Sequence, residues 1–197
     1  MMKTKIWTLS CSLLVSTAVA TFADEPNKSP AAEIASATAE DSVNHIQIPA
    51  GTELELIASE PQVIDPIAIR FDEFGRMWVA QMGDYPEGKG KSSIRILEDL
   101  DNDGEFETSR VFADDLHFVT GLQPWKQGVI VTMAGRVAYM KDTDGDHQAD
   151  IIEDWYVGFS EDNTQLRANH PRLGLDNHVY VANGLRGGVF KNPRSKD

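Results

Sequence analysis

Cysteine is almost absent from the sequence. Among 197 residues there is one cysteine, Cys11, which excludes a disulfide scaffold, a cysteine-ligated zinc site and a CxxCH haem attachment motif. This chain therefore binds no c-type haem. If the segment around Cys11 is removed during export, thiol catalysis is excluded as well.

Positive charge is also scarce. The 31 acidic residues outnumber the 18 basic ones, giving a formal net charge of −13 at pH 7. A surface of this sign repels phosphate backbones and anionic lipid headgroups. The composition therefore predicts no nucleic-acid partner and no adhesion to anionic membranes.

Long apolar runs are confined to the N-terminus. Lys3 and Lys5 precede an apolar run over residues 6–19, and small residues follow up to Ala23. This order is typical of a secretory signal peptide, and the run is short for a bilayer span. We expect residues 1–23 to be a signal peptide. The mature protein would then be periplasmic or extracellular, with no stable membrane span after cleavage; a retained N-terminal anchor is the alternative.

Residues 24–45 contain few large apolar side chains and are rich in Ala, Ser, Glu and Pro. Such a segment cannot bury enough surface to fold, so we expect a disordered linker. The folded domain should begin at Ile46.

Helical periodicity is missing from the rest of the chain. Instead, short runs with β-branched and aromatic residues alternate with Gly, Asp and Pro, which predicts an all-β fold. The expected strands are 66–71, 76–80, 93–97, 108–112, 121–125, 128–132, 136–140, 151–157, 172–174, 178–182 and 188–190.

The order of these strands repeats. Four short strands per unit, at a period of about fifty residues, is typical of β-propeller blades. Residues 46–197 would hold two and a half to three such blades, an incomplete propeller, since closure takes about four to eight. A β-sandwich is the alternative. Because an open array leaves a sheet edge uncovered, we expect a partner chain or self-association to complete it.

Two loops share an acidic pattern, D-x-D-x-D-x-x-x-[DE]. They span residues 99–107 and 142–150, between the third and fourth strands of the first two units. Alternate carboxylates in a tight turn are hard oxygen ligands that suit a structural Ca²⁺ ion. A solvated Asp-Gly turn is the alternative. The candidate ligands are Asp99, Asp101, Asp103, Glu107, Asp142, Asp144, Asp146 and Asp150.

One polar segment is a candidate for acid–base chemistry. It carries Arg167, Asn169, His170 and Arg172 between two units of the repeat. A histidine among arginines and an amide could abstract a proton while the neighbouring cations bind an anionic cofactor. A surface loop of mixed polar residues is the alternative.

The motif order resembles a known family. Residues 65–86, 98–132, 141–150 and 174–184 are similar to the N-terminal β-propeller of the membrane-bound dehydrogenases found in large exported bacterial proteins. That group is similar in turn to the soluble glucose and sorbosone dehydrogenases that use pyrroloquinoline quinone (PQQ). The resemblance spans about residues 46–190 and implies a propeller that oxidises sugars or alcohols. Full-length relatives often continue into a c-type haem domain, which would accept the electrons.

The resemblance also implies roles for single residues. Asn169-His170 ahead of Arg172-Leu173-Gly174 is similar to the motif that supplies the catalytic base of PQQ sugar dehydrogenases, although the spacing to the following aspartate is shorter here. By this resemblance His170 and Arg172 would be catalytic, and Arg167 and Asn169 would bind the cofactor. With blades missing, the pocket at the propeller axis would be incomplete.

The sequence leaves three functions open. The first is an exported dehydrogenase module that uses PQQ and passes electrons to a haem domain outside this chain. The second is a non-catalytic, calcium-stabilised propeller that binds glycan or protein. The third is a fragment without activity of its own. We expect little activity from the chain alone.

Overall fold

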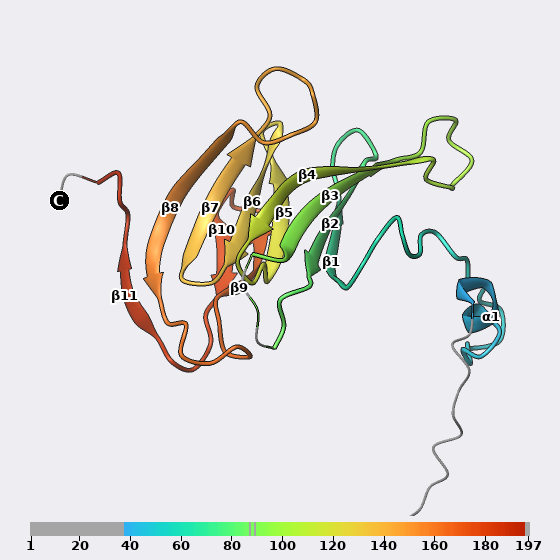
Figure 1. The fold of residues 1–197 in the computed structure, drawn as a ribbon, viewed down its shortest axis with the longest axis horizontal. Helices are drawn as coiled ribbons and strands as arrows, with labels where there is room; N and C mark the ends of the chain where they lie inside the picture. Colours follow the sequence, from blue (N-terminus) through green and yellow to red (C-terminus); the bar gives the residue numbers. More distant parts are fainter. Residues whose placement is uncertain (1–37, 87, 89, 196–197) are drawn as a thin grey trace, which may run out of the picture. The chain divides into compact units, whose positions relative to one another are not determined.

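The computed structural model describes residues 38–86, 88 and 90–195 (Figure 1). The predicted signal peptide lies outside these residues, as does most of the predicted linker. The described end of the linker contains helix α1 (Ala39–Val43), whose first turn is capped by Thr38: its Oγ1 accepts a hydrogen bond from the Asp41 amide at 3.1 Å. Within the described residues no helix is long and apolar enough to cross a membrane.

The first sheet is an antiparallel meander in which neighbours in sequence are neighbours in space. Its strands are β1 (Pro66–Phe71), β2 (Met77–Met82), β3 (Ser92–Glu98) and β4 (Thr108–Leu116). The second sheet repeats this arrangement with β5 (Gly121–Trp125), β6 (Gly128–Met133), β7 (Arg136–Lys141) and β8 (Ile151–Phe159). Every predicted strand overlaps an observed one, and the all-β prediction is confirmed.

The third unit differs from its prediction. β9 (Asn169–Leu173) and β10 (Val179–Ala182) pair as expected, but β11 (Gly188–Lys191) does not join them as a third strand. It pairs with β8, at the edge of the second sheet (Figure 1). Glycine explains the close approach, because a Cβ at Gly158 would overlap the carbonyl oxygen of Val189. The third unit is therefore two-stranded, and the second sheet has five strands instead of four.

A hydrophobic seam joins the first two sheets. Trp78 and Phe112 meet edge to face in it, with ring centroids 4.8 Å apart. Successive residues of β2 point to opposite faces of the sheet, and both faces are covered, which explains why five of its six residues are buried. The seam is built from Trp78, Ala80, Ile94, Ile96, Phe112, Leu116, Val119, Leu122, Val129, Val131, Met133, Ala138 and Met140.

The first strands of the three units lie next to one another. β1 packs against β5, and β5 packs against β9. On the other face of the first sheet, Met77 and Val79 are covered by residues around Val63 and Phe106. The outer residues of β1 on that face, Ile67, Ile69 and Phe71, stay exposed. The order β1, β5, β9 determines which side chains can meet across the units.

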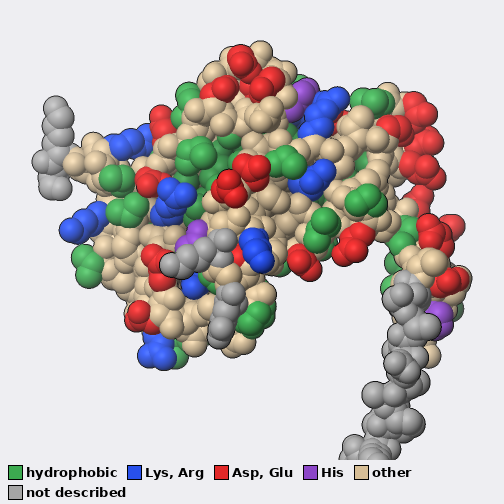
Figure 2. Space-filling view, viewed as in Figure 1, with side chains coloured by type: hydrophobic (Ala, Val, Ile, Leu, Met, Phe, Trp, Pro, Cys, Tyr) green, Lys and Arg blue, Asp and Glu red, His purple; other side chains and the backbone are tan. Residues whose placement is uncertain are grey.

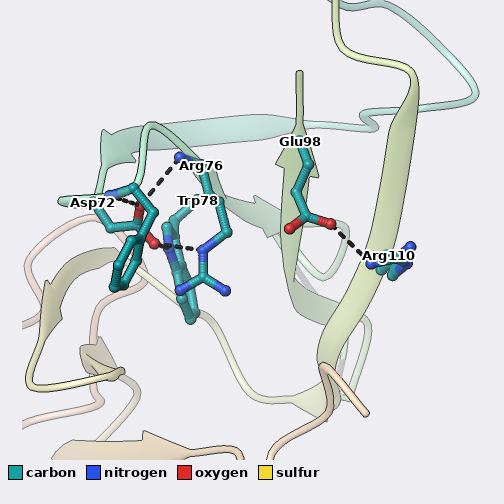
Figure 3. Close-up of polar contacts among 6 residues, drawn as sticks. Asp72, Arg76, Trp78, Glu98 and Arg110 are labelled. Atoms are coloured by element: carbon teal, nitrogen blue, oxygen red, sulfur yellow. Dashed lines mark hydrogen bonds and ion pairs between the residues drawn. The ribbon is translucent and has the colours of Figure 1, made fainter. Parts of the chain in front are cut away.

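A buried carboxylate fixes the β1–β2 turn. Asp72 Oδ1 accepts the amide hydrogens of Phe74 and Arg76, while Oδ2 accepts from Arg76 Nε at 2.7 Å and Trp78 Nε1 at 2.8 Å (Figure 3). Only 3% of the Asp72 side chain is exposed. Burial alone would raise the pKa of Asp72, but the hydrogen bonds from Trp78, Phe74 and Arg76 lower it below its ordinary value.

Asp72→Asn should destabilise the fold by about 2 kcal/mol, because an amide leaves part of this donor set unpaired. The folded pKa lies below the unfolded value, so the stabilisation is complete above about pH 4 and is lost as the pH falls through the folded pKa. Urea unfolding at neutral and acidic pH checks both points. The exposed Asp114→Asn is the control, and equal losses in the two variants would contradict the prediction.

Candidate functional site

The candidate site centres on His170, in strand β9. Its Nε2 atom lies 3.1 Å from Arg172 Nε and 3.4 Å from Arg70 Nη2. Arg70 comes from β1, a hundred residues earlier in the chain. Since β1 and β9 both neighbour β5, the packing of the units brings these three side chains together. We call His170, Arg70 and Arg172 the histidine–arginine cluster.

The approach of β9 to β5 depends on a glycine. A Cβ at Gly121 would lie 2.9 Å from the His170 backbone nitrogen, closer than real Cβ contacts come. Next to it, Thr120 Oγ1 donates to the carbonyl oxygen of Ala168 at 2.6 Å. His170 itself has φ 56°, a conformation that non-glycine residues rarely adopt. Such a backbone is maintained only where the surroundings impose it, and it is frequent at functional sites.

The surroundings of His170 favour the neutral form of its imidazole ring. Partial desolvation, followed by the positive charges of Arg172 and Arg70, lowers the pKa of His170 from its ordinary value. A guanidinium can only donate hydrogen bonds, so Nε2 accepts and the ring proton is assigned to Nδ1. At neutral pH the cluster therefore combines a neutral imidazole, on an exposed residue, with two cations.

The other two predicted residues of this segment point elsewhere. The buried Arg167 stacks on Phe118, with its guanidinium carbon 3.8 Å from the ring centroid. Its Nη2 donates to the Glu161 carbonyl oxygen at 3.4 Å, while Nε and Nη1 have no partner among the described residues. Asn169 donates to the Arg167 carbonyl oxygen at 3.2 Å. Arg167 and Asn169 therefore lie outside the histidine–arginine cluster, and their role in binding a cofactor stays a prediction.

Sequence reasoning missed Arg70. It was included in the strand prediction for 66–71 without a role, yet it is the one charged residue in that strand. The signal available in the sequence was a single positively charged residue within an otherwise apolar strand. Its contact with His170 could not be predicted, because it depends on how the repeated units pack.

The first acidic loop gathers all four of its predicted ligands. Carboxylate oxygens of Asp99, Asp101, Asp103 and Glu107 lie within 4.8 Å of one another. Glu107 also accepts the Leu100 amide hydrogen at 2.6 Å, which ties the end of the loop to its start. The loop connects β3 to β4 and projects from the sheet (Figure 1).

The second acidic loop gathers three of its four. Asp142, Asp144 and Asp146 bring carboxylate oxygens within 4.8 Å of one another. Asp150 is outside this group and accepts two hydrogen bonds from Thr143, at 2.6 and 2.7 Å. It holds the place of Glu107 in the first loop, and its side chain is one methylene shorter. Figure 2 shows acidic side chains gathered at the top and at the right of the view, where the two loops lie.

The two loops share one internal hydrogen-bond pattern. The first aspartate accepts the amide hydrogens of the fourth and sixth loop residues, at 2.7 and 3.0 Å for Asp99 and at 2.7 and 2.9 Å for Asp142. The sixth residue is Gly104, with φ 98°, or His147, with φ 68°. His147 therefore adopts the left-handed conformation that glycine provides in the first loop.

Close carboxylates affect one another's ionisation. The nearby charge of Asp103 is the main reason that the pKa of Asp101 is raised. In the second loop, the backbone N–H of Gly145 is the main reason that the pKa of Asp142 is lowered. The first loop thus carries like-charge repulsion that a bound divalent cation would relieve.

Residues 38–197 match a family described as a domain of unknown function, DUF7133. The chain belongs to the DUF7133 family. No curated protein and no solved structure matches it. The DUF7133 description gives neither an activity nor a cofactor.

Two groups of side chains in this DUF7133 domain are suited to bind a ligand or to take part in a reaction. The histidine–arginine cluster offers a base beside two cations, which suits an anionic ligand with a proton to remove. The acidic loops offer oxygen donors without nitrogen or sulfur, which suits a hard cation.

Proposed function

We propose that the chain is part of an exported PQQ-dependent dehydrogenase that oxidises a sugar or an alcohol. The contact of His170 with Arg70 and Arg172 carries the proposal, because it combines a neutral basic nitrogen with two cations. The motif around Asn169-His170 supports it by resemblance.

The cluster suits a quinone that carries carboxylates. Arg70 Nε is buried without a hydrogen-bond partner in the described part of the chain, so a donor there is left for an anion. Arg70 and Arg172 would bind carboxylates of PQQ through charge-assisted hydrogen bonds. Bound PQQ would supply an acceptor for the hydride of the substrate C–H bond. Once Arg70 and Arg172 donate to the PQQ carboxylates instead of to His170, Nε2 would be free to accept the hydroxyl proton as the carbonyl group forms.

The proposal includes a β-propeller architecture. The neighbouring first strands β1, β5 and β9 support it, because the innermost strands of successive blades line a propeller's axis. In this architecture the cluster would face the axis. Further blades from a partner chain or from self-association would close the array, and a c-type haem domain elsewhere would accept the electrons.

Titration of the chain with PQQ, followed by tryptophan fluorescence, tests the site. We expect saturable binding that Arg70→Ala and Arg172→Ala each weaken by about tenfold, the loss of one charge-assisted contact. Arg194→Ala is the control, since Arg194 pairs with Glu153 outside the cluster. Absence of binding, or equal affinity in all three variants, would contradict the proposal.

A second candidate is a non-catalytic module stabilised by calcium that binds glycan or protein. The specific observation in its favour is the same hydrogen-bonded carboxylate loop occurring twice, at equivalent places in two sheets. In this candidate Asp99, Asp101, Asp103 and Glu107 would hold one Ca²⁺ ion, and Asp142, Asp144 and Asp146 a second. The ions would rigidify the hairpins, and they are compatible with the dehydrogenase proposal.

A further inference from the structure

Two cavities lie on either side of the β1–β2 turn. One has a volume of about 570 Å³ and the other about 490 Å³, and Phe74 and Arg76 line both. Sizes in this range are usual for small-molecule sites. Phe74, at the tip of the turn, is 70% exposed between them. We call the two cavities together the turn groove.

Arg76 is held rigidly at the centre of the turn groove. Its Nε binds Asp72, and its guanidinium carbon lies 5.4 Å from the ring centroid of Phe74 and 5.7 Å from that of Trp78 (Figure 3). Neither Nη atom has a hydrogen-bond partner within the described residues. Since the ion pair and the two rings already fix the side chain, little conformational entropy would be lost when these donors bind an acceptor.

Both cavities combine the exposed ring of Phe74 with hydrogen-bond donors and acceptors. The larger one includes Phe71, Phe106, Asn102 and Glu98, whose carboxylate is fixed by Arg110 at 2.8 Å (Figure 3). The smaller one includes Gln127, His147 and aspartates of the second acidic loop, with Trp78 and Phe112 buried beneath it. Such a lining matches a ligand with apolar faces and many hydroxyl groups, because the exposed rings of Phe71 and Phe74 can cover its C–H faces while amides and charged groups bind its hydroxyls.

Charge narrows the choice of ligand. The two acidic loops border the turn groove, so a polyanion would be repelled. Arg76 at the centre disfavours a polycation. In Figure 2, basic and hydrophobic side chains lie between the two acidic clusters. A neutral ligand with hydrogen-bond donors and acceptors fits both conditions. Because Phe74 lines both cavities, the turn groove suits a ligand with more than one ring.

We propose that the turn groove binds a neutral oligosaccharide, with Phe74 stacking between two sugar units and Arg76 donating to their hydroxyl groups. The site is separate from the histidine–arginine cluster, because Arg70, His170 and Arg172 line neither of the two cavities. The inference therefore does not depend on the dehydrogenase proposal. The turn groove would hold a glycan, while the reaction proposed above takes place elsewhere.

Calorimetric titration of the full chain with cellotetraose, maltotetraose and mannotetraose tests the inference, with hexalysine and tetragalacturonate as charged probes. At least one neutral tetrasaccharide should bind, and Phe74→Ala should weaken it by about tenfold, as loss of an aromatic anchor does. Gln127→Ala, in the smaller cavity, should weaken it less. Leu185→Ala, another exposed apolar residue, should leave the affinity unchanged.

Failure of all three tetrasaccharides to bind would overturn the inference, as would binding of a charged probe alone. Equal affinity in Phe74→Ala and Leu185→Ala would also overturn it. Circular dichroism of each variant shows whether the fold is intact. If Phe74→Ala does not fold, Gln127→Ala decides, and unchanged affinity in that variant then counts against the turn groove.

Discussion

Removal of calcium is expected to lower the melting temperature of the chain by about 10 °C. One site that is saturated at a thousand times its dissociation constant stabilises the fold by about 4 kcal/mol, and each kcal/mol is worth about 2–4 °C in a protein of this size. The four gathered carboxylates of the first loop give the reason, since their mutual repulsion is relieved only when the cation is bound. Thermal melts in millimolar calcium and in excess chelator measure the difference.

The variants of this experiment separate calcium from general charge effects. Asp103→Asn and Asp146→Asn, one in each acidic loop, should each remove part of the calcium response. Asp114→Asn, an exposed carboxylate of β4, should keep all of it. Equal melting temperatures with calcium and with chelator would show that both loops are solvated turns.

Ile94→Ala is expected to destabilise the fold by about 3 kcal/mol, the cost of a large-to-small change in a close-packed core. Ile94 is fully buried in the seam between the first two sheets, so neighbours from both sheets would border the cavity. The loss should appear as a lower midpoint in urea unfolding with an unchanged slope.

The same substitution at an exposed site provides the control. Ile67 in β1 is 44% exposed, and Ile67→Ala should cost less than about 1 kcal/mol. Comparable losses at the two positions would mean that the seam does not hold the sheets together.

Strand positions were predictable from the sequence because turn residues interrupt short β-type runs throughout the chain. The partner of a strand was less predictable. β11 pairs with β8 through close backbone contact at Gly158, a tertiary fit that has no local pattern. Prediction was most reliable for structure built from neighbouring residues.

The candidate sites follow the same rule: arrangements within one short segment were easier to predict than contacts that depend on packing between strands. The four predicted ligands of the first loop lie close together, because alternate positions in one short turn fix their proximity, and calcium binding by them stays a prediction. Asp150 does not join the second group, since the shorter side chain binds Thr143 instead. In the histidine–arginine cluster, His170 and Arg172 were candidates from the sequence. Arg70 was not, because it reaches His170 through the packing of β1 and β9 against β5.

An NMR titration of the histidine side chains with PQQ tests the central claim most directly. The ring signals of His170 should shift saturably with added PQQ, while those of His45 and His178, exposed and outside the cluster, stay in place. In the free chain, His170 should titrate below its ordinary pKa and carry its proton on Nδ1. Unmoved His170 signals at saturating PQQ, or equal shifts in all three residues, would contradict the assignment of the cluster as a cofactor site.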